Sequence, residues 1–215
     1  MRLALLFALA AALWAQDVRY PPQNQEIPGP PTPADFPAWL ADIEHWRAER
    51  RIRIGYDDAE YRRPEFQWTQ SSFIQPKMMV EDRYFYDPVA GKYTVDRYLD
   101  DLEKRYGGID SVLVWHTYPN IGIDNRNQND LLRDLPGGIE GVRQMIADFH
   151  RRGVRVLFPI MLWDQGTRVE GEPNWTATAK LFAAVGADGL NGDTLRGVPR
   201  AFRLASDQRG HPLVL

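Results

Sequence analysis

The chain has 215 residues, 44% of them hydrophobic, which is enough for one sizeable globular domain. A formal net charge of -3 and a pI near 5.8 exclude the strongly basic composition typical of nucleic-acid-binding proteins. The absence of cysteine excludes disulfides, thiolate metal ligands and cysteine nucleophiles.

The first 15 residues have the pattern of an export signal. Arg2 provides the positive end, an apolar run follows from Leu3 to Leu13, and the small residue Ala15 precedes Gln16. The run is too short to span a bilayer comfortably. We therefore expect residues 1–15 to be a signal peptide, with a secreted or periplasmic location and no membrane span after its removal. A buried N-terminal helix is the alternative.

Two further segments precede the main domain. Residues 16–37 are rich in proline, which predicts an extended segment on the surface. Residues 38–70 are expected to hold an N-terminal helix and an irregular stretch. The helix should run over residues 34–51, because apolar side chains recur there at helical spacing.

From residue 71 onward the pattern alternates between strands and helices. Short apolar runs predict strands over 72–80, 111–118, 154–162, 188–192 and 211–215. Amphipathic spacing predicts helices over 94–106, 138–152, 174–185 and 198–208. Thr94 is expected to cap the first of these helices, and Gly153 to stop the second. Pro159 requires an irregularity near the end of its strand.

This alternation predicts an α/β fold with a parallel sheet covered by helices. The sheet could close into a (β/α)8 TIM barrel or stay open and doubly wound. We favour the barrel, because the glycine-rich turn of dinucleotide-binding sheets is absent. A barrel takes roughly 250 residues, so residues 71–215 are expected to be a partial barrel of about four βα units and a fifth strand. A complete small open sheet is the alternative.

The ends of the predicted strands carry the candidate binding residues. Carboxylates and amides can accept and donate hydrogen bonds to sugar hydroxyls, and tryptophan offers a flat face to a sugar ring. The candidates are Trp115, Asp124, Trp163, Asp164, Asn191 and Asp193. Three of them have structural alternatives: a solvated turn with Asx caps for the run from Asp124 to Asp130, packing at the rim for Trp163, and a helix cap for Asp193. His116 is interpreted as a structural histidine.

The segment from Asp188 to Thr194, with sequence Asp-Gly-Leu-Asn-Gly-Asp-Thr, resembles the fourth-strand signature of the retaining α-glycosidase superfamily, which includes melibiase-type α-galactosidases and α-glucosidases. The helix and strand over 138–162 are similar to the elements that precede that signature. By this resemblance Asp193 would be the nucleophile, and Asp124 and Asp164 would bind sugar hydroxyls. The resemblance covers roughly residues 109–194, which would be the N-terminal half of such a barrel.

The sequence also departs from that superfamily. Asn191 stands where melibiase-type members have lysine, and Leu195-Arg196 stand where α-glucosidase-type members have Asn-Glu. The acid/base residue of the superfamily comes from a later strand, which this sequence does not contain. Neither the substrate nor the activity is therefore fixed by the resemblance.

The sequence thus predicts a glycoside hydrolase-like protein that acts on an α-linked glycoside by a retaining mechanism, with carbohydrate as its partner. A non-catalytic carbohydrate-binding or scaffold barrel is the alternative. A lyase or aldolase would need a lysine at a strand end, for which Lys77 is the one weak candidate. We expect no cofactor, and no cluster has the spacing of metal ligands.

Overall fold

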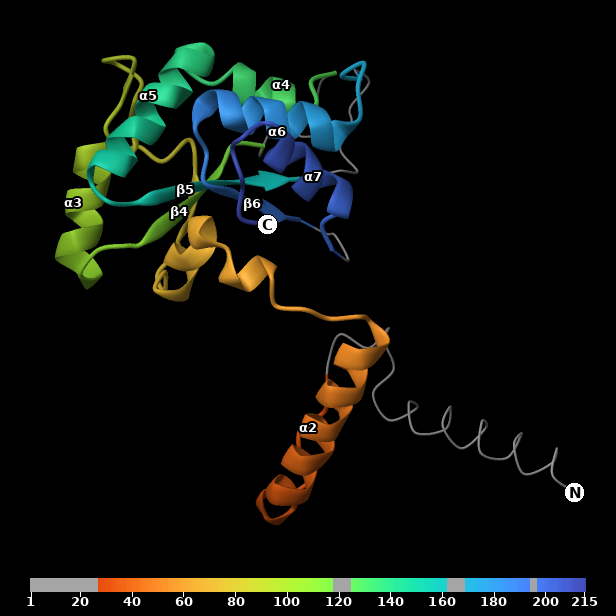
Figure 1. Cartoon of the computed structure of the whole chain (residues 1–215). Coiled ribbons are helices and arrows are strands. Elements are labelled where there is room, and N and C mark those ends of the chain that lie inside the picture. The colour runs from red at the N-terminus through yellow and green to blue at the C-terminus, as the bar shows by residue number, and fades with distance from the viewer. Residues whose placement is uncertain (1–26, 118–124, 162–168, 194–196) are drawn as a thin grey trace, which may run out of the picture. The chain divides into compact units, whose positions relative to one another are not determined.

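The computed structural model describes residues 27–117, 125–161, 169–193 and 197–215, and Figure 1 shows the whole chain. The expected signal peptide lies outside these ranges. The chain divides into two compact units, residues 1–60 and 61–215. The boundary falls ten residues before the expected start of the α/β domain, so residues 61–70 belong to the larger unit.

The smaller unit contains one long helix. A 3-10 turn, η2 (Pro33–Asp35), leads into α2 (Phe36–Arg53), close to the expected range of 34–51. Within this unit the indole N–H of Trp39 donates to the carbonyl of Pro28 at 2.8 Å. This bond ties the proline-rich segment to the helix.

The larger unit is built on a parallel sheet. Its strands are β1 (Lys77–Met79), β4 (Ser111–Trp115), β5 (Arg155–Ile160) and β6 (Gly189–Gly192), hydrogen-bonded in that order. The expected fifth strand is reduced to one bridge, in which Val214 pairs with Gly189 in the parallel sense. Each successive strand therefore joins the same edge of the sheet.

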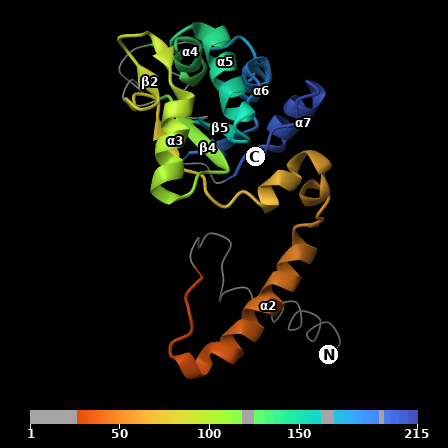
Figure 2. The ribbon, with the colours of Figure 1, turned by 90° about the vertical axis from the view of Figure 1, so that its left-hand side faces the viewer.

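Helices connect these strands. They are α3 (Val95–Tyr106), α4 (Gln128–Arg133), α5 (Gly138–Arg151), α6 (Asn174–Val185) and α7 (Arg200–Gln208). Four of them were expected, and α4 was not. A small antiparallel hairpin of β2 (Tyr86–Asp87) and β3 (Lys92–Tyr93) was also missed, because its strands are only two residues long. Figures 1 and 2 show α3, α5 and α6 arranged around β4 and β5.

One expected cap is wrong in detail. Helix α3 does follow Thr94, but the Thr94 hydroxyl donates to the carbonyl of Tyr84 at 2.7 Å and makes no cap hydrogen bond. The side chain is therefore used to fasten the hairpin. The stop at Gly153 is confirmed: α5 ends at Arg151, and Gly153 has φ of 75°, a conformation that glycine adopts without strain.

The sheet has one face covered by helices. Alternate strand residues, including Val112, Val156 and Leu190, belong to the large core cluster together with apolar residues of α3, α5, α6 and α7. All four helices therefore pack on the same face of the sheet. A parallel sheet with its strands in chain order and its connecting helices on one side follows from right-handed crossovers that all run in one direction.

The opposite face has a smaller core. We call this face the helix-free face, because none of α3, α5, α6 and α7 packs on it. The smaller core consists of Leu113, Trp115, Leu157 and Met161, with Trp68 packed against them. Trp68 comes from the 3-10 segment η4 (Pro64–Gln70), which follows the short 3-10 turn η3 (Glu60–Arg62). The N-terminal part of the larger unit thus covers some of the apolar surface that the helices leave open.

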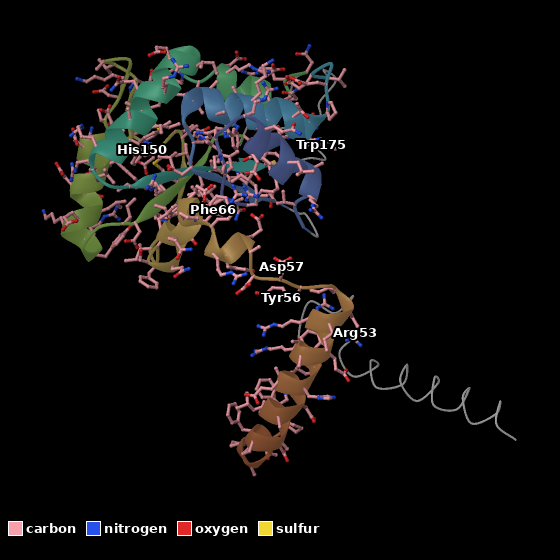
Figure 3. All side chains as sticks on the ribbon, viewed as in Figure 1. Arg53, Tyr56, Asp57, Phe66, His150 and Trp175 are labelled. Carbon is pink, nitrogen blue, oxygen red and sulfur yellow. The ribbon has the colours of Figure 1, made fainter. Side chains whose placement is uncertain are left out.

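The segment η4 is anchored to the last helix. Phe66, labelled in Figure 3, is buried, and the guanidinium carbons of Arg63 and Arg203 lie 4.6 and 4.5 Å from its ring centroid. Arg63 also donates two hydrogen bonds of 2.9 Å to the carboxylate of Asp207 in α7. These contacts explain why residues 61–70 belong with the α/β unit.

Candidate functional site

The candidate nucleophile lies directly after β6. The backbone N–H of Asp193 donates to the carbonyl of Ile160 at 2.9 Å, so the residue is held at the carboxyl end of the sheet. Its side chain is half-buried, and no residue that the structure describes forms a hydrogen bond with its carboxylate. Within the described part of the fold, this carboxylate therefore has no structural partner.

The register places the neighbouring polar residue on the helix-free face. In β6, Asn191 pairs with Pro159 and Gly189 with Leu157, and paired residues of a parallel sheet point to the same face. Leu157 belongs to the helix-free core, so Asn191 lies on that face, where it is exposed. By strand alternation Asp193 continues the same row.

The alternative role of Asp193 as a helix cap does not hold. Helix α7 begins at Arg200, two residues later than expected, and its N-cap position is Pro199 without a side-chain hydrogen bond. Asp193 is six residues before that position. The carboxylate therefore has no structural duty at the start of α7.

Trp115 occupies the helix-free face in an unexpected setting. Its side chain is only 3% exposed and packs with Leu113, Leu157 and Met161. The ammonium group of Lys77 lies 3.5 Å from the centroid of its ring, which is a cation–π contact. Stacking of a sugar on that side of the ring would require Lys77 to move away.

Three other candidates cannot be placed. Asp124, Trp163 and Asp164 lie outside the described residues. In the sequence they follow the carboxyl ends of β4 and β5, the same end of the sheet that carries Asp193. Their roles as sugar ligands remain predictions.

Strands β4 and β5 separate near this end. Their register runs from Ser111 and Arg155 to Leu113 and Leu157 and stops there. Two residues later Pro159 has no N–H to donate, although β5 continues through it and pairs it with Asn191 of β6. The next available donor, the N–H of Met161, bonds at 2.6 Å to Oε1 of Gln128 in α4. The side-chain oxygen of Gln128 thus accepts the hydrogen bond that a backbone carbonyl of a neighbouring strand would otherwise accept.

His116, the residue after β4, also holds Gln128 in place, through the Gln128 backbone. Its Nε2 lies 3.1 Å from the backbone oxygen of Gln128, so this nitrogen carries the hydrogen and donates. Burial lowers the pKa of His116 to about 4, which keeps the ring neutral near pH 7. The ring also meets Phe158 edge to face, at a centroid distance of 5.6 Å. His116 is therefore structural, as expected.

A buried polar cluster stabilises the start of α4. We define the Glu170 cluster as Asn127, Asn129, Asp130, Arg133 and Glu170. Arg133 donates two hydrogen bonds of 2.9 Å to the Glu170 carboxylate, and the two asparagines donate at 3.0 and 3.3 Å. The bonds from Arg133, then those from the asparagines, lower the pKa of Glu170 to about 2 against the effect of burial.

The same cluster corrects one part of the alternative interpretation, a solvated turn with Asx caps: a cap is present, but residues 127–130 are not solvated. Asn127 is the N-cap of α4 and accepts from the Asp130 N–H at 2.9 Å, while the side chain of Asp130 faces the N–H of Asn127. All four residues from Asn127 to Asp130 are buried. The spacing Asn-x-x-Asp is a form of the capping box and could have predicted this turn. The local sequence around Glu170 shows no comparable pattern, because the partners of Glu170 are about 40 residues away in the chain.

The other carboxylate of the resembling segment has a structural role. Asp188 lies at the amino end of β6 and accepts hydrogen bonds from His150 at 2.6 Å, Arg155 at 2.8 Å and the Val156 N–H at 2.8 Å. Burial alone would raise the pKa of Asp188, but these donors together outweigh it and the net shift is downward.

Gly189 admits the close approach of Val214, whose oxygen would lie 2.8 Å from an added Cβ.

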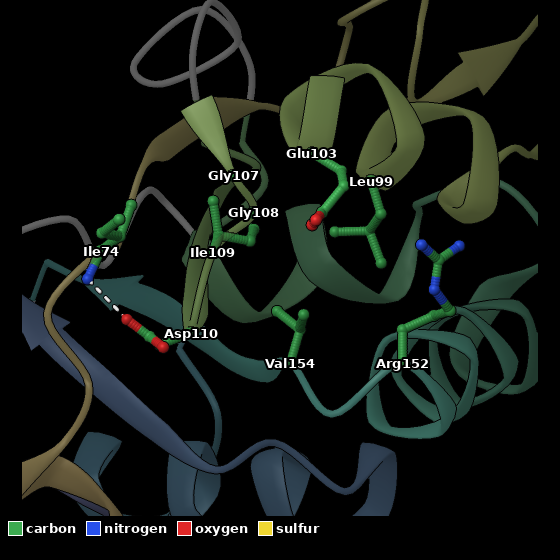
Figure 4. Close-up of a pocket in the computed structure, with 9 residues that line it drawn as sticks. All are labelled: Ile74, Leu99, Glu103, Gly107, Gly108, Ile109, Asp110, Arg152 and Val154. Atoms are coloured by element: carbon green, nitrogen blue, oxygen red, sulfur yellow. Dashed lines mark hydrogen bonds between the residues drawn. The ribbon is translucent and has the colours of Figure 1, made fainter. Parts of the chain in front are cut away.

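A pocket of about 180 Å³ lies at the amino ends of the strands, away from Asp193. Figure 4 shows Glu103, Asp110 and Arg152 around it, with the Asp110 carboxylate accepting from the Ile74 N–H at 2.8 Å. Asp110 also accepts from the Phe73 N–H, and Arg152 pairs with Asp96 and Asp100. Asp110 and Arg152 already serve the fold, and enzymes built on parallel sheets place chemistry at the carboxyl ends of the strands. This pocket at the amino ends is therefore not the candidate active site.

A second pocket, of about 370 Å³, is mainly apolar and lies beside the β2–β3 hairpin, against Leu135 and Pro136. Its tyrosines, Tyr86 and Tyr93, pack against the helix-covered core. It is therefore separate from the helix-free face that carries Asn191.

No His, Asp or Glu group among the described residues has a geometry that could hold a metal ion. Within the same ranges, no helix has the length and apolar character needed to cross a bilayer. No protein-family model matches the chain, and no curated protein was found to be similar to it.

Proposed function

We propose that the chain is a glycoside hydrolase-like protein of the retaining type and that Asp193 is its nucleophile. The observation that carries the proposal is the state of the Asp193 carboxylate. It lies at the carboxyl end of a parallel strand, in the row of Asn191, and no described residue uses it as a hydrogen-bond acceptor. A half-buried carboxylate that has no partner among the described residues is a candidate for chemistry.

We further propose that the sheet is the first part of a (β/α)8 barrel. Two features support this: the strands of the parallel sheet follow one another in chain order, and α3, α5, α6 and α7 pack on one face. A doubly wound sheet would instead reverse its strand order and carry helices on both faces. In a barrel the helix-free face would become the interior, and Asn191 and Asp193 would face the mouth.

The chemistry follows from that position. In a retaining reaction the Asp193 carboxylate would attack the anomeric carbon of an α-linked glycoside and form a covalent ester, while a carboxylic acid protonates the departing oxygen. Water would then cleave the ester and return the carboxylate. The second carboxyl group has to lie about 5 Å away, and we assign it to none of the described residues.

The test is turnover of a panel of 4-nitrophenyl α-glycosides by the full chain and by Asp193→Asn. We expect the variant to lose at least about a thousandfold in kcat, since it lacks a nucleophile. Azide should restore turnover in Asp193→Ala by occupying the vacated space. Asp134→Asn is the matched control, because Asp134 is an exposed aspartate of the same unit.

Equal rates for wild type and Asp193→Asn would remove Asp193 from catalysis. Sugar binding without turnover by the wild type would instead favour the non-catalytic carbohydrate-binding alternative.

The proposed location is the periplasm or the cell exterior, based on the pattern of residues 1–15. Determining the N-terminus of the mature protein after expression in a bacterial host tests this. An N-terminus at or next to Gln16 supports export, and an intact Met1 on cytoplasmic protein contradicts it.

A further inference from the structure

Two polar side-chain atoms are buried at the carboxyl end of β4 and β5 without a partner. Neither Thr117 Oγ1 nor Gln128 Nε2 has a hydrogen-bond partner among the described residues. The two residues are 0% and 3% exposed. Leaving a buried hydroxyl or amide unbonded costs about 1–3 kcal/mol each. Native proteins rarely retain such groups unless water or a ligand bonds to them.

Both residues belong to the carboxyl ends of neighbouring strands, where Asp193 also lies. Thr117 comes two residues after β4, which ends at Trp115. Gln128 is bound to the end of β5, because its Oε1 accepts from the N–H of Met161, the residue after Ile160. Asp193 directly follows β6, and its N–H donates to the carbonyl of Ile160. The threonine hydroxyl, the amide N–H groups and the proposed nucleophile thus lie at the same end of the sheet.

The amide of Gln128 is held in a fixed position. Its Oε1 is bound to Met161, and its backbone oxygen accepts from His116. Its neighbours Asn127 and Asn129 are bound in turn to Glu170. Because Oε1 already accepts from Met161, the group of the side chain without a partner among the described residues is Nε2, which has two hydrogens to donate. A donor fixed in this way needs little reorganisation when a ligand binds.

The two free groups are complementary to a hydroxyl. The amide Nε2 can donate to a ligand oxygen, and the threonine hydroxyl can accept the ligand's hydrogen or donate its own. A neutral oxygen that both accepts and donates satisfies them, whereas a carboxylate or phosphate would leave the acceptor side of Thr117 unused.

We propose that Thr117 and Gln128 bind a hydroxyl group of the sugar ring that sits against Asp193. The two residues form the hydroxyl-binding pair of the site. This inference rests on the proposed function and deepens it, because it names residues that select a polyhydroxylated ligand.

Two substitutions separate binding from folding. Thr117→Val keeps the shape and removes the hydroxyl. Gln128→Glu keeps the oxygen that bonds to Met161 and removes the Nε2 donor. Thr94→Val is the matched control, since its hydroxyl is bonded to Tyr84 within the protein. Each variant of the full chain is measured for KM and kcat on 4-nitrophenyl α-glycosides, for binding of D-galactose, D-glucose and D-mannose by calorimetry, and for its melting temperature.

We expect Thr117→Val and Gln128→Glu each to weaken sugar binding, or to raise KM, by about 5- to 20-fold. Thr117→Val should not lower the melting temperature, because it replaces an unpaired buried hydroxyl by a methyl group. Thr94→Val should lower the melting temperature and leave sugar affinity unchanged.

The outcomes distinguish this inference from the function on which it rests. If Asp193→Asn loses turnover while Thr117→Val and Gln128→Glu keep wild-type KM and affinity, the hydroxyl-binding pair is wrong and the nucleophile stands. A lower melting temperature of Thr117→Val with unchanged affinity shows a structural hydroxyl and also overturns the pair. A wild type that neither binds nor cleaves any sugar of the panel overturns both proposals.

Discussion

Two aspartates on one strand, five residues apart, have opposite environments. Asp188 at the amino end of β6 accepts from His150, Arg155 and the Val156 N–H. Asp193 at the carboxyl end receives no hydrogen bond from the described residues. The first carboxylate stabilises the fold, and the second has no hydrogen-bond partner among the described residues. In enzymes built on parallel sheets, chemistry is placed at the carboxyl ends of the strands, which is the end that carries Asp193.

The largest expected effect is a loss of activity, which should distinguish Asp193 from Asp188. Asp193→Asn should lower turnover of a cleaved aryl α-glycoside at least about a thousandfold while leaving the free energy of unfolding within about 0.5 kcal/mol of wild type. Urea unfolding and initial rates on the same preparation measure both quantities. A stability loss above about 2 kcal/mol would show that Asp193 is structural after all.

The reverse pattern is expected at the other end. Asp188→Asn should lower the free energy of unfolding by about 2–3 kcal/mol, because the neighbouring donors lose a buried carboxylate. Turnover per folded molecule should stay at the wild-type level. His150→Ala, which removes one partner at the surface, should cost less. Full stability of Asp188→Asn would contradict the division of the strand.

The pH dependence of the free energy of unfolding tests the role of a third carboxylate, that of Glu170. The pKa of Glu170 is about 2 in the folded chain, against an ordinary value of 4.5. Its bonds therefore stabilise the fold fully above pH 4.5, and this contribution is lost as the pH falls toward 2. Glu170→Gln should cost about 1–3 kcal/mol at pH 7.

The measurement is urea unfolding of wild type and Glu170→Gln at pH 7, 5 and 3. The difference between the two should be nearly constant from pH 7 to 5 and should shrink at pH 3. Glu140→Gln is the control, because Glu140 is an exposed glutamate on α5. A difference that does not change with pH would show that the Glu170 carboxylate is not held ionised by its partners.

The smallest expected effect is at the cap of α4. Asn127→Ala should lower the free energy of unfolding by about 1 kcal/mol, because the Asp130 N–H loses its acceptor and Glu170 loses a donor. Asn127→Ser keeps an acceptor for the cap and loses only the bond to Glu170, so it should cost less. Equal losses for both variants would assign the whole effect to Glu170.

The sequence determined most of the secondary structure of the larger unit, for local reasons. Apolar spacing predicted α5 and α6 within one residue at each end, and a glycine in the left-handed region ends each of them. Strand β6 was predicted over 188–192 and is found over Gly189–Gly192. Pro159 was expected to disturb its strand, since a missing N–H is a property of the residue itself.

Only the tertiary structure decided which polar groups serve the fold. The sequence singles out Asp193 as the candidate nucleophile, but it gives no sign of the donors around Asp188. A capping role for Asp193 stayed open until the structure showed that α7 begins after Pro199. The Glu170 cluster joins residues about 40 positions apart, and Gln128 fills a gap between two strands. Local pattern fixes which segments are helices and strands, because backbone preference acts over a few residues. The use of a side chain depends on partners from distant segments, and only packing brings those together.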